Sequence, residues 1–179
     1  MDYIAALKNI VSNYDAFCLI AKNIEWISIK PHYDDWFYCA LGMYLYTFEF
    51  PQEYIQNHPQ QAYVRALFSR IAFDEEWDND FWNIPQMERT FYLEKGSAFY
   101  KSYAIPRELR LIKRDWNYLA NEMKDFAKIN NIPFSKQKPY IEQFEHAAVI
   151  EIGGAYHGDS EYLAIKDNHM LMVNCGCWD

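Results

Sequence analysis

The residues from Phe73 to Trp82 combine acidic and aromatic side chains in one short run. The run holds five carboxylates, two tryptophans and two phenylalanines, and it contains no basic residue. Crowded carboxylates repel one another, so they are expected to face water or a positively charged partner. Tryptophan is strongly enriched at binding hot spots. The pattern therefore predicts a docking surface for a basic partner, made of Asp74, Glu75, Glu76, Trp77, Asp78, Asp80 and Trp82.

A plainer interpretation of the same run is a solvated helix end or loop. The tryptophans would then fold back into the core, and the carboxylates would only keep the protein soluble, as most charged surface residues do. Both interpretations stay open at this point, because the sequence does not say which way the aromatic rings point.

A second candidate site involves Cys175 and Cys177, which share an acidic segment with His146, His157 and His169. Two thiolates and one or two imidazoles are a familiar ligand set for structural zinc. The usual zinc pairing places two to four residues between the cysteines, whereas a single glycine separates this pair. We therefore expect no metal and no other cofactor, and we expect these cysteines to pack as small hydrophobic residues on a strand.

A third candidate is the glycine-flanked stretch from Gly153 to Ser160, which presents His157 and Asp159. Together they could act as an acid–base pair. A strand-to-strand connection that needs the backbone freedom of glycine explains the same residues more simply. No Gly-x-Ser-x-Gly or His-Glu-x-x-His motif occurs in the chain, and no catalytic residue is predicted. An enzyme or metal-binding protein that uses His157, Asp159, Cys175 and Cys177 remains the alternative hypothesis.

Basic side chains gather before and within an apolar pattern that starts near Pro106. They are interpreted as the solvated face of a helix rather than as a phosphate or nucleic-acid patch, because Glu108 and Asp115 interrupt the positive field. The basic residues concerned are Arg107, Arg110, Lys113 and Arg114.

The formal net charge of −8 is unevenly distributed along the chain. Residues 1–85 carry a net −7, residues 86–139 a net +5 and residues 140–179 a net −6. An acidic protein with one basic third is a poor general nucleic-acid binder. The charge favours a basic protein partner, whose approach the electric field accelerates.

Cysteine use and hydropathy point to a cytoplasmic protein. There are only four cysteines, no charged and apolar leader opens the chain, and no apolar run approaches the length of a membrane span. We therefore expect reduced thiols and no membrane partner. Nothing in the sequence indicates an oligomeric state.

Apolar spacing predicts helices over most of the first three quarters of the chain. The expected helices cover residues 3–14, 34–48, about 59–73, 87–103 and a long one that follows Pro106, with an apolar stripe of Leu109, Ile112, Trp116, Leu119, Met123 and Phe126. Three strands are expected after Pro139, at 147–152, 161–165 and 170–173, with a hairpin turn at 166–169. The predicted fold class is α+β and mostly α, as a single domain over 1–179 that is helical over 1–135 and β-rich over 140–179.

In its general character, a single acidic domain without catalytic motifs, the chain resembles bacterial immunity proteins, which neutralise cognate toxins. That resemblance implies a non-enzymatic inhibitor that occludes the active site of a basic, nuclease-like toxin. A phage or regulatory inhibitor of some other host machine would fit the same features, and the sequence does not separate the two.

Overall fold

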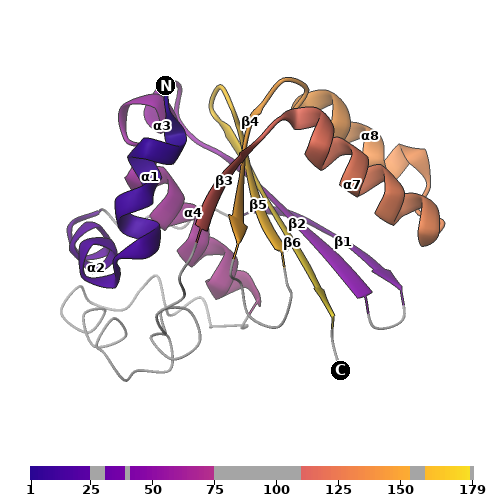
Figure 1. Ribbon diagram of the computed structural model, residues 1–179, viewed down its shortest axis with the longest axis horizontal. Coiled ribbons are helices and arrows are strands. Elements are labelled where there is room, and N and C mark those ends of the chain that lie inside the picture. Colours follow the sequence, from indigo (N-terminus) through magenta and orange to yellow (C-terminus); the bar gives the residue numbers. More distant parts are fainter. Residues whose placement is uncertain (25–30, 39–40, 75–109, 154–159, 178–179) are drawn as a thin grey trace.

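The computed structural model describes residues 1–24, 31–38, 41–74, 110–153 and 160–177 (Figure 1). Within these ranges the chain forms six helices and one six-stranded antiparallel sheet. The helices are α1 (Tyr3–Ser12), α2 (Tyr14–Asn23), α3 (Tyr54–Asn57), α4 (Pro59–Asp74), α7 (Trp116–Ile129) and α8 (Phe134–Gln143). The strands are β1 (His32–Tyr38), β2 (Leu41–Glu49), β3 (Arg110–Arg114), β4 (Ala148–Gly153), β5 (Ser160–Lys166) and β6 (His169–Cys177).

The strand order in the sheet is β1-β2-β6-β5-β4-β3. The β1–β2 hairpin therefore joins the C-terminal strand, as the pairing of Thr47 with Leu171 shows. From β6 the sheet continues through β5 and β4 to β3, which contributes five residues at the far side. Strands from the first and last thirds of the chain thus lie side by side at the centre of the sheet.

Helices cover both faces of this sheet (Figure 1). On β6, Met170 and Met172 belong to the core shared with α1, α2 and α4, while Leu171 and Val173 belong to the core shared with α7 and α8. Successive side chains of a strand point to opposite faces, so a strand covered on both sides must be apolar at nearly every position. The run from Met170 to Val173 meets this requirement.

The predicted fold class is wrong, because strands occur throughout the chain rather than only near the C-terminus. The expected helix over 34–48 is the hairpin of β1 and β2. Trp36 and Leu45 pack against α7 and α8, whereas Phe48 packs against the opposite helical layer. A strand buried on both faces gives a near-continuous apolar run, and such a run also satisfies helical spacing. A single domain over 1–179 stays a prediction, but its helical division over 1–135 does not hold.

The long helix expected after Pro106 is also wrong in its first half. Residues 110–114 form β3, and the helix begins only at Trp116. Asp115 separates the two elements, since its side-chain Oδ1 accepts a hydrogen bond of 2.8 Å from the backbone N–H of Tyr118 and so caps α7. From Trp116 onward the predicted apolar stripe is confirmed, with Trp116, Leu119 and Met123 buried.

The other expected helices and strands agree better with the structure. The first expected helix corresponds to α1, which ends at Ser12. The helix α2 was not predicted, and it begins after Asn13, whose side chain accepts a hydrogen bond from the N–H of Ala16. The helix expected from Pro59 is α4, and the three expected late strands are β4, β5 and β6, with Asp167 at a φ of 53° in the predicted turn. The helix expected over 87–103 lies outside the described residues.

Candidate functional site

One end of the sheet gathers the chain segments that carry the predicted site residues. We call it the lower edge, because it lies at the bottom of Figure 1, where β1, β4 and β6 end and β2, β3 and β5 begin. The strand register defines this edge through three pairs, Arg110 with Gly153, Ser160 with Cys175, and Leu41 with Cys177.

The helix α4 reaches the same edge. Arg70 Nη1 lies 3.2 Å from Glu161 Oε1, and these side chains are 7% and 13% exposed. Glu161 is the second residue of β5, so the ion pair fixes α4 one row inside the lower edge. Asp74, the last residue of α4, follows Arg70 by four residues, or ~6 Å along the helix axis.

Of the predicted docking residues, only Asp74 belongs to an element that the structure describes. Glu75, Glu76, Trp77, Asp78, Asp80 and Trp82 lie outside the described residues. The chain leaves α4 at Asp74 and enters β3 at Arg110, which is itself at the lower edge. The acidic segment is therefore attached at this edge, and its role in docking stays a prediction.

The structure separates two histidines of the candidate zinc set, His146 and His169, from its cysteines. Cys175 is partly buried on β6, opposite Ser160, and Cys177 ends the strand at the lower edge. His169 is the first residue of β6, six positions before Cys175 and thus ~20 Å away along the strand. His146 is exposed in the turn before β4, at the same upper end as His169.

Neither His146 nor His169 can therefore share a metal with Cys175. Among the described residues, no group of three or more histidine, cysteine, aspartate or glutamate side chains is placed to hold a metal ion. His157 and Asp159 lie outside those residues, so the acid–base hypothesis stays untested.

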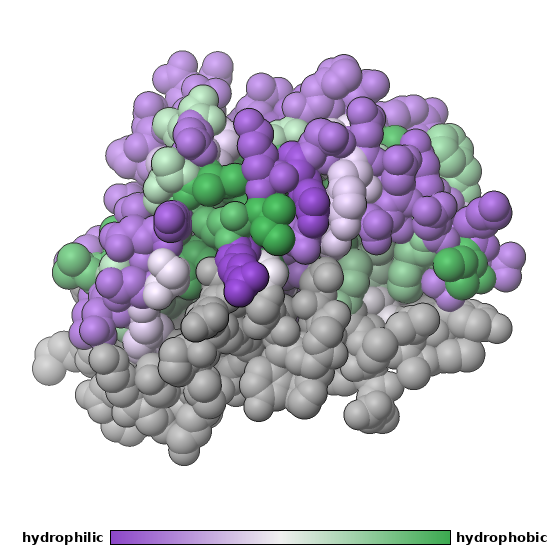
Figure 2. Space-filling model, in the orientation of Figure 1, coloured by the Kyte–Doolittle hydropathy of each residue, from purple (hydrophilic) through white to green (hydrophobic). Residues whose placement is uncertain are grey.

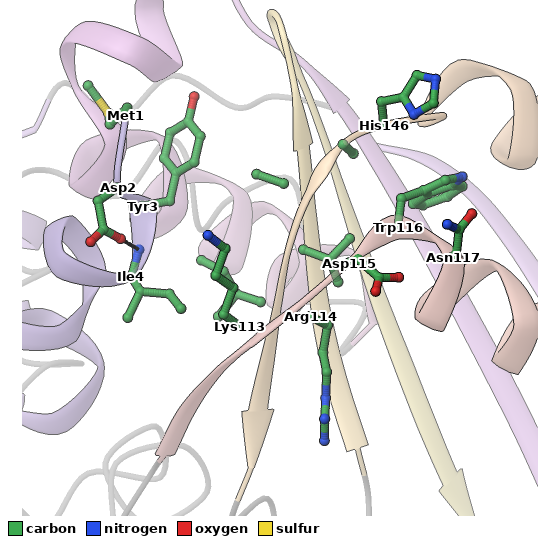
Figure 3. A pocket seen from close by; sticks show the side chains of 14 residues that line it. Met1, Asp2, Tyr3, Ile4, Lys113, Arg114, Asp115, Trp116, Asn117 and His146 are labelled. Atoms are coloured by element: carbon green, nitrogen blue, oxygen red, sulfur yellow. Dashed lines mark hydrogen bonds between the residues drawn. The ribbon is translucent and has the colours of Figure 1, made fainter.

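A groove of about 550 Å³ lies between the two helical layers at the upper end of β3 and β4 (Figure 3). Its lining comes from the start of α1, the end of β3, the start of α7 and the start of β4. Figure 2 shows hydrophobic surface between α1 and β3, bordered by hydrophilic residues. The sequence did not predict this groove, because its residues come from three distant segments, 1–4, 113–117 and 146–150.

The groove has an apolar floor and a mixed polar rim. Val149 and Ile150 are buried beneath it, while Lys113 and His146 are exposed at its border. Asp2 Oδ1 accepts hydrogen bonds from the N–H groups of Ile4 and Ala5, at 3.1 and 3.2 Å. Asp115 likewise accepts from the N–H of Tyr118, so both helix N-termini carry a side-chain cap from within the chain.

Three residues of the basic cluster lie on edge strand β3 and not on a helix, namely Arg110, Lys113 and Arg114, so the interpretation of the cluster as one helical face is wrong. Figure 3 shows Lys113 and Arg114 pointing to opposite sides of the strand. Arg114 Nε donates a 2.6 Å hydrogen bond to Glu151 Oε2, which raises the pKa of the guanidinium, and the guanidinium lies 4.5 Å from the ring centroid of Tyr118. Arg110 and Lys113 are exposed, and Arg107 lies outside the described residues. This arrangement does not form a single phosphate-binding face.

A partly buried polar contact connects β1 with α8. Asp34 Oδ2 accepts a 3.3 Å hydrogen bond from Trp36 Nε1, and Asp34 Oδ1 lies 3.7 Å from Lys136 Nζ. Burial, and then the negative charge of Asp34, raise the pKa of Tyr140 well above its ordinary value. The phenol is thus held neutral, and the group joins the hairpin to the helical layer.

None of the helices in the described ranges combines the length and the apolar composition required to cross a membrane. Comparison of the chain with protein-family models, with curated proteins and with solved structures finds no match.

Proposed function

We propose that this chain is a non-enzymatic acidic binding protein, an immunity protein that neutralises a basic, nuclease-like toxin by covering its active site. The observation that supports this proposal is the position of Asp74, with which the acidic segment starts. It begins at the end of α4, and the buried ion pair between Arg70 and Glu161 fixes that helix against the sheet. A docking segment that starts from a fixed point loses less conformational freedom on binding.

Charge supplies the second line of support. A nuclease needs a positive surface to hold phosphates, and this chain carries a net charge of −8. Complementary charge accelerates the encounter between two proteins, and in the complex of barnase with barstar close charge pairs across such an interface couple strongly. The carboxylates would provide steering, and Trp77 and Trp82 would provide the desolvated anchors.

The alternative of a small enzyme keeps one specific point of support. Cys175 lies opposite Ser160, which directly follows Asp159 in the sequence, so parts of that hypothetical site also meet at the lower edge. A regulatory inhibitor of another host machine would use the same acidic segment and differ only in its partner.

The test compares two variants of equal charge against a cognate toxin, sought as the product of a neighbouring gene. The first variant replaces Asp74, Glu75, Glu76, Asp78 and Asp80 with the corresponding amides. The control neutralises five exposed acids on other elements, namely Asp35, Glu53, Glu122, Asp125 and Glu145. Association and dissociation rate constants are measured for both, at low and at high salt.

We expect the first variant to associate much more slowly than the control and to lose most of its salt dependence, because charges on the interface steer more than distant ones. Equal rate constants for the two variants would show that the acidic run is only a solvated surface. The interface would then have to be sought among the acids of residues 140–179.

A further inference from the structure

The turn between α7 and α8 exposes two large apolar side chains. Ile129, the last residue of α7, is 72% exposed, and Phe134, the first residue of α8, is 60% exposed. Among the side chains whose exposure the structure describes, only Met1 and Leu19 are large, apolar and similarly exposed. The turn lies at the right-hand end of the molecule in Figure 1, and Figure 2 shows hydrophobic atoms there among hydrophilic ones.

This exposure is a property of a well-fixed turn. The buried amide of Asn130 donates from Nδ2 to the carbonyl of Phe126 at 2.9 Å, and the buried amide of Gln137 donates from Nε2 to the carbonyl of Ile132 at 2.8 Å. The N–H of Ile132 also bonds the carbonyl of Ala127 at 2.8 Å, and Asn131 adopts a φ of 55° between them. Two buried polar side chains thus hold the turn in a conformation that leaves its apolar side chains in water.

The charge around the turn is opposite to that of the whole protein. Residues 124–138 contain four lysines and one acid, Asp125, a net +3 in a chain of net −8. Lys124 and Lys128 are exposed on α7, and Lys136 and Lys138 are about half exposed on α8. Lys136 and Lys138 have carboxylate neighbours, at 3.7 Å from Asp34 and Glu142 respectively. The local excess of lysine therefore favours a negatively charged partner over Ile129 and Phe134.

The size of the surface favours one kind of anionic partner. A stable protein interface buries ~800 Å² on each partner and needs a matching shape, which two side chains at a convex turn do not provide. A second copy of this chain would place lysines against lysines if the contact were symmetric. An anionic bilayer needs no matching pocket, since apolar side chains enter its interface while lysines remain at the headgroups.

We propose that the turn from Ile129 to Phe134, with its surrounding lysines, docks on the surface of an anionic phospholipid bilayer. Ile129 and Phe134 enter the interfacial region, and Lys124 and Lys128 contact the headgroups. The rest of the chain, being acidic, is repelled and faces away from the surface. The inference departs from the sequence-based expectation of no membrane partner and does not depend on the proposed inhibitor function.

The test measures sedimentation of the full chain with vesicles of phosphatidylcholine alone and of phosphatidylcholine with phosphatidylserine. We expect binding only to the second kind, and less binding at high salt. Phe134→Ser should lower the partition coefficient about ten-fold through lost apolar burial, and Lys124→Glu should lower it at least about five-fold.

Matched controls separate this site from general stickiness. Leu19→Ser removes an exposed apolar side chain on α2, 63% exposed, and Lys8→Glu reverses an exposed charge on α1. Both controls should bind vesicles like the unmodified chain, and circular dichroism should show all four variants folded. Absence of binding to the phosphatidylserine vesicles, or equal losses in the control variants, would overturn the proposal.

Discussion

Arg70 of α4 and Glu161 of β5 form a nearly buried ion pair that joins the helical layer to the sheet at its lower edge, with 3.2 Å between Nη1 and Oε1. Removing one partner leaves the other charge buried, which typically costs ~3–5 kcal/mol. We expect Arg70→Met and Glu161→Gln each to lower the free energy of unfolding by about this amount, as measured by urea denaturation.

The double variant Arg70→Met with Glu161→Leu should be more stable than either single variant, because no charge is then left unpaired. A loss below ~1 kcal/mol in the single variants, the size found for exposed pairs, would mean that water reaches this contact and that α4 is not fixed by it.

Trp116 provides a second stability test. It is 6% exposed at the start of α7, and its ring centroid lies 6.3 Å from that of Phe144. Trp116→Ala should lower the free energy of unfolding by ~3–5 kcal/mol, as large aromatic truncations in cores do. Ile129→Ala on the same helix is the control and should change it by less than ~0.5 kcal/mol, the scale of surface substitutions.

The raised pKa of Tyr140 should make the free energy of unfolding depend on pH in the alkaline range. The unfolded chain ionises its tyrosines near pH ~10, whereas burial and then the charge of Asp34 raise the pKa of Tyr140 in the folded protein. The folded state therefore favours the neutral phenol, so this contribution is present below about pH 10 and is lost as the pH rises from there towards the folded pKa.

The corresponding experiment compares the unmodified chain with Tyr140→Phe in urea denaturation at about pH 8 and about pH 11. The variant should lose less stability between the two pH values, since phenylalanine has no proton to release. An identical loss in both proteins would show that other groups account for the alkaline effect.

The two tryptophans of the acidic run should act on dissociation rather than on association. Trp77→Ala or Trp82→Ala should weaken binding to the cognate toxin by ~2 kcal/mol or more if either ring is a hot spot. The change should be visible in the dissociation rate constant, because anchors act after encounter. If both variants dissociate at the unmodified rate, the aromatic rings belong to the core or to another surface.

Metal analysis tests the alternative site directly. We expect no stoichiometric zinc in the purified protein and no unfolding on addition of a chelator, because a structural metal would contribute its binding energy to folding. One zinc ion per chain would favour the enzyme or metal-binding hypothesis and would place its ligands among residues near the lower edge.

The sequence predicts elements well where a local signal is sufficient. Pro59 correctly marks the start of α4, and the short apolar run from Tyr162 to Ile165 correctly marks β5. In both places the pattern reflects contacts that repeat along one short segment.

Prediction of secondary structure from apolar spacing fails where a strand is buried on both faces, because the alternation of apolar and polar residues is then lost. Apolar spacing places Trp36 and Leu45 in a helix, because β1 and β2 pack against helices on both faces. On the face opposite Trp36 and Leu45, β1 contributes Tyr33 and β2 contributes Phe48. The stripe through Ile112 and Trp116 crosses from β3 into α7, and only the capping aspartate between them marks the break. In the sequence, Asp115 looks like an acid that interrupts the basic face of a helix. Its position three residues before Tyr118 is instead that of an N-cap residue.

The lower edge itself is beyond prediction, because it depends on strand order. No local pattern indicates that Cys175 lies opposite Ser160, or that Arg110 lies opposite Gly153. The candidate residues are recognisable by their chemical types, while their common location follows only from the topology of the sheet.

The central place of β6 has a consequence for how the protein is made. Phe50 and Asn168, 118 positions apart, exchange hydrogen bonds where β2 meets the final hairpin. During synthesis, the β1–β2 hairpin therefore leaves the ribosome long before β6, its neighbour in the sheet, has been made. The apolar side chains on both faces of the hairpin cannot be fully buried until residues 169–177 are available. Folding that depends on such distant pairing is slow, so the nascent chain is exposed to aggregation and to chaperones throughout its synthesis. Truncation before His169 would leave β1–β2 and β3–β4–β5 as two separate fragments of a sheet with nothing to join them.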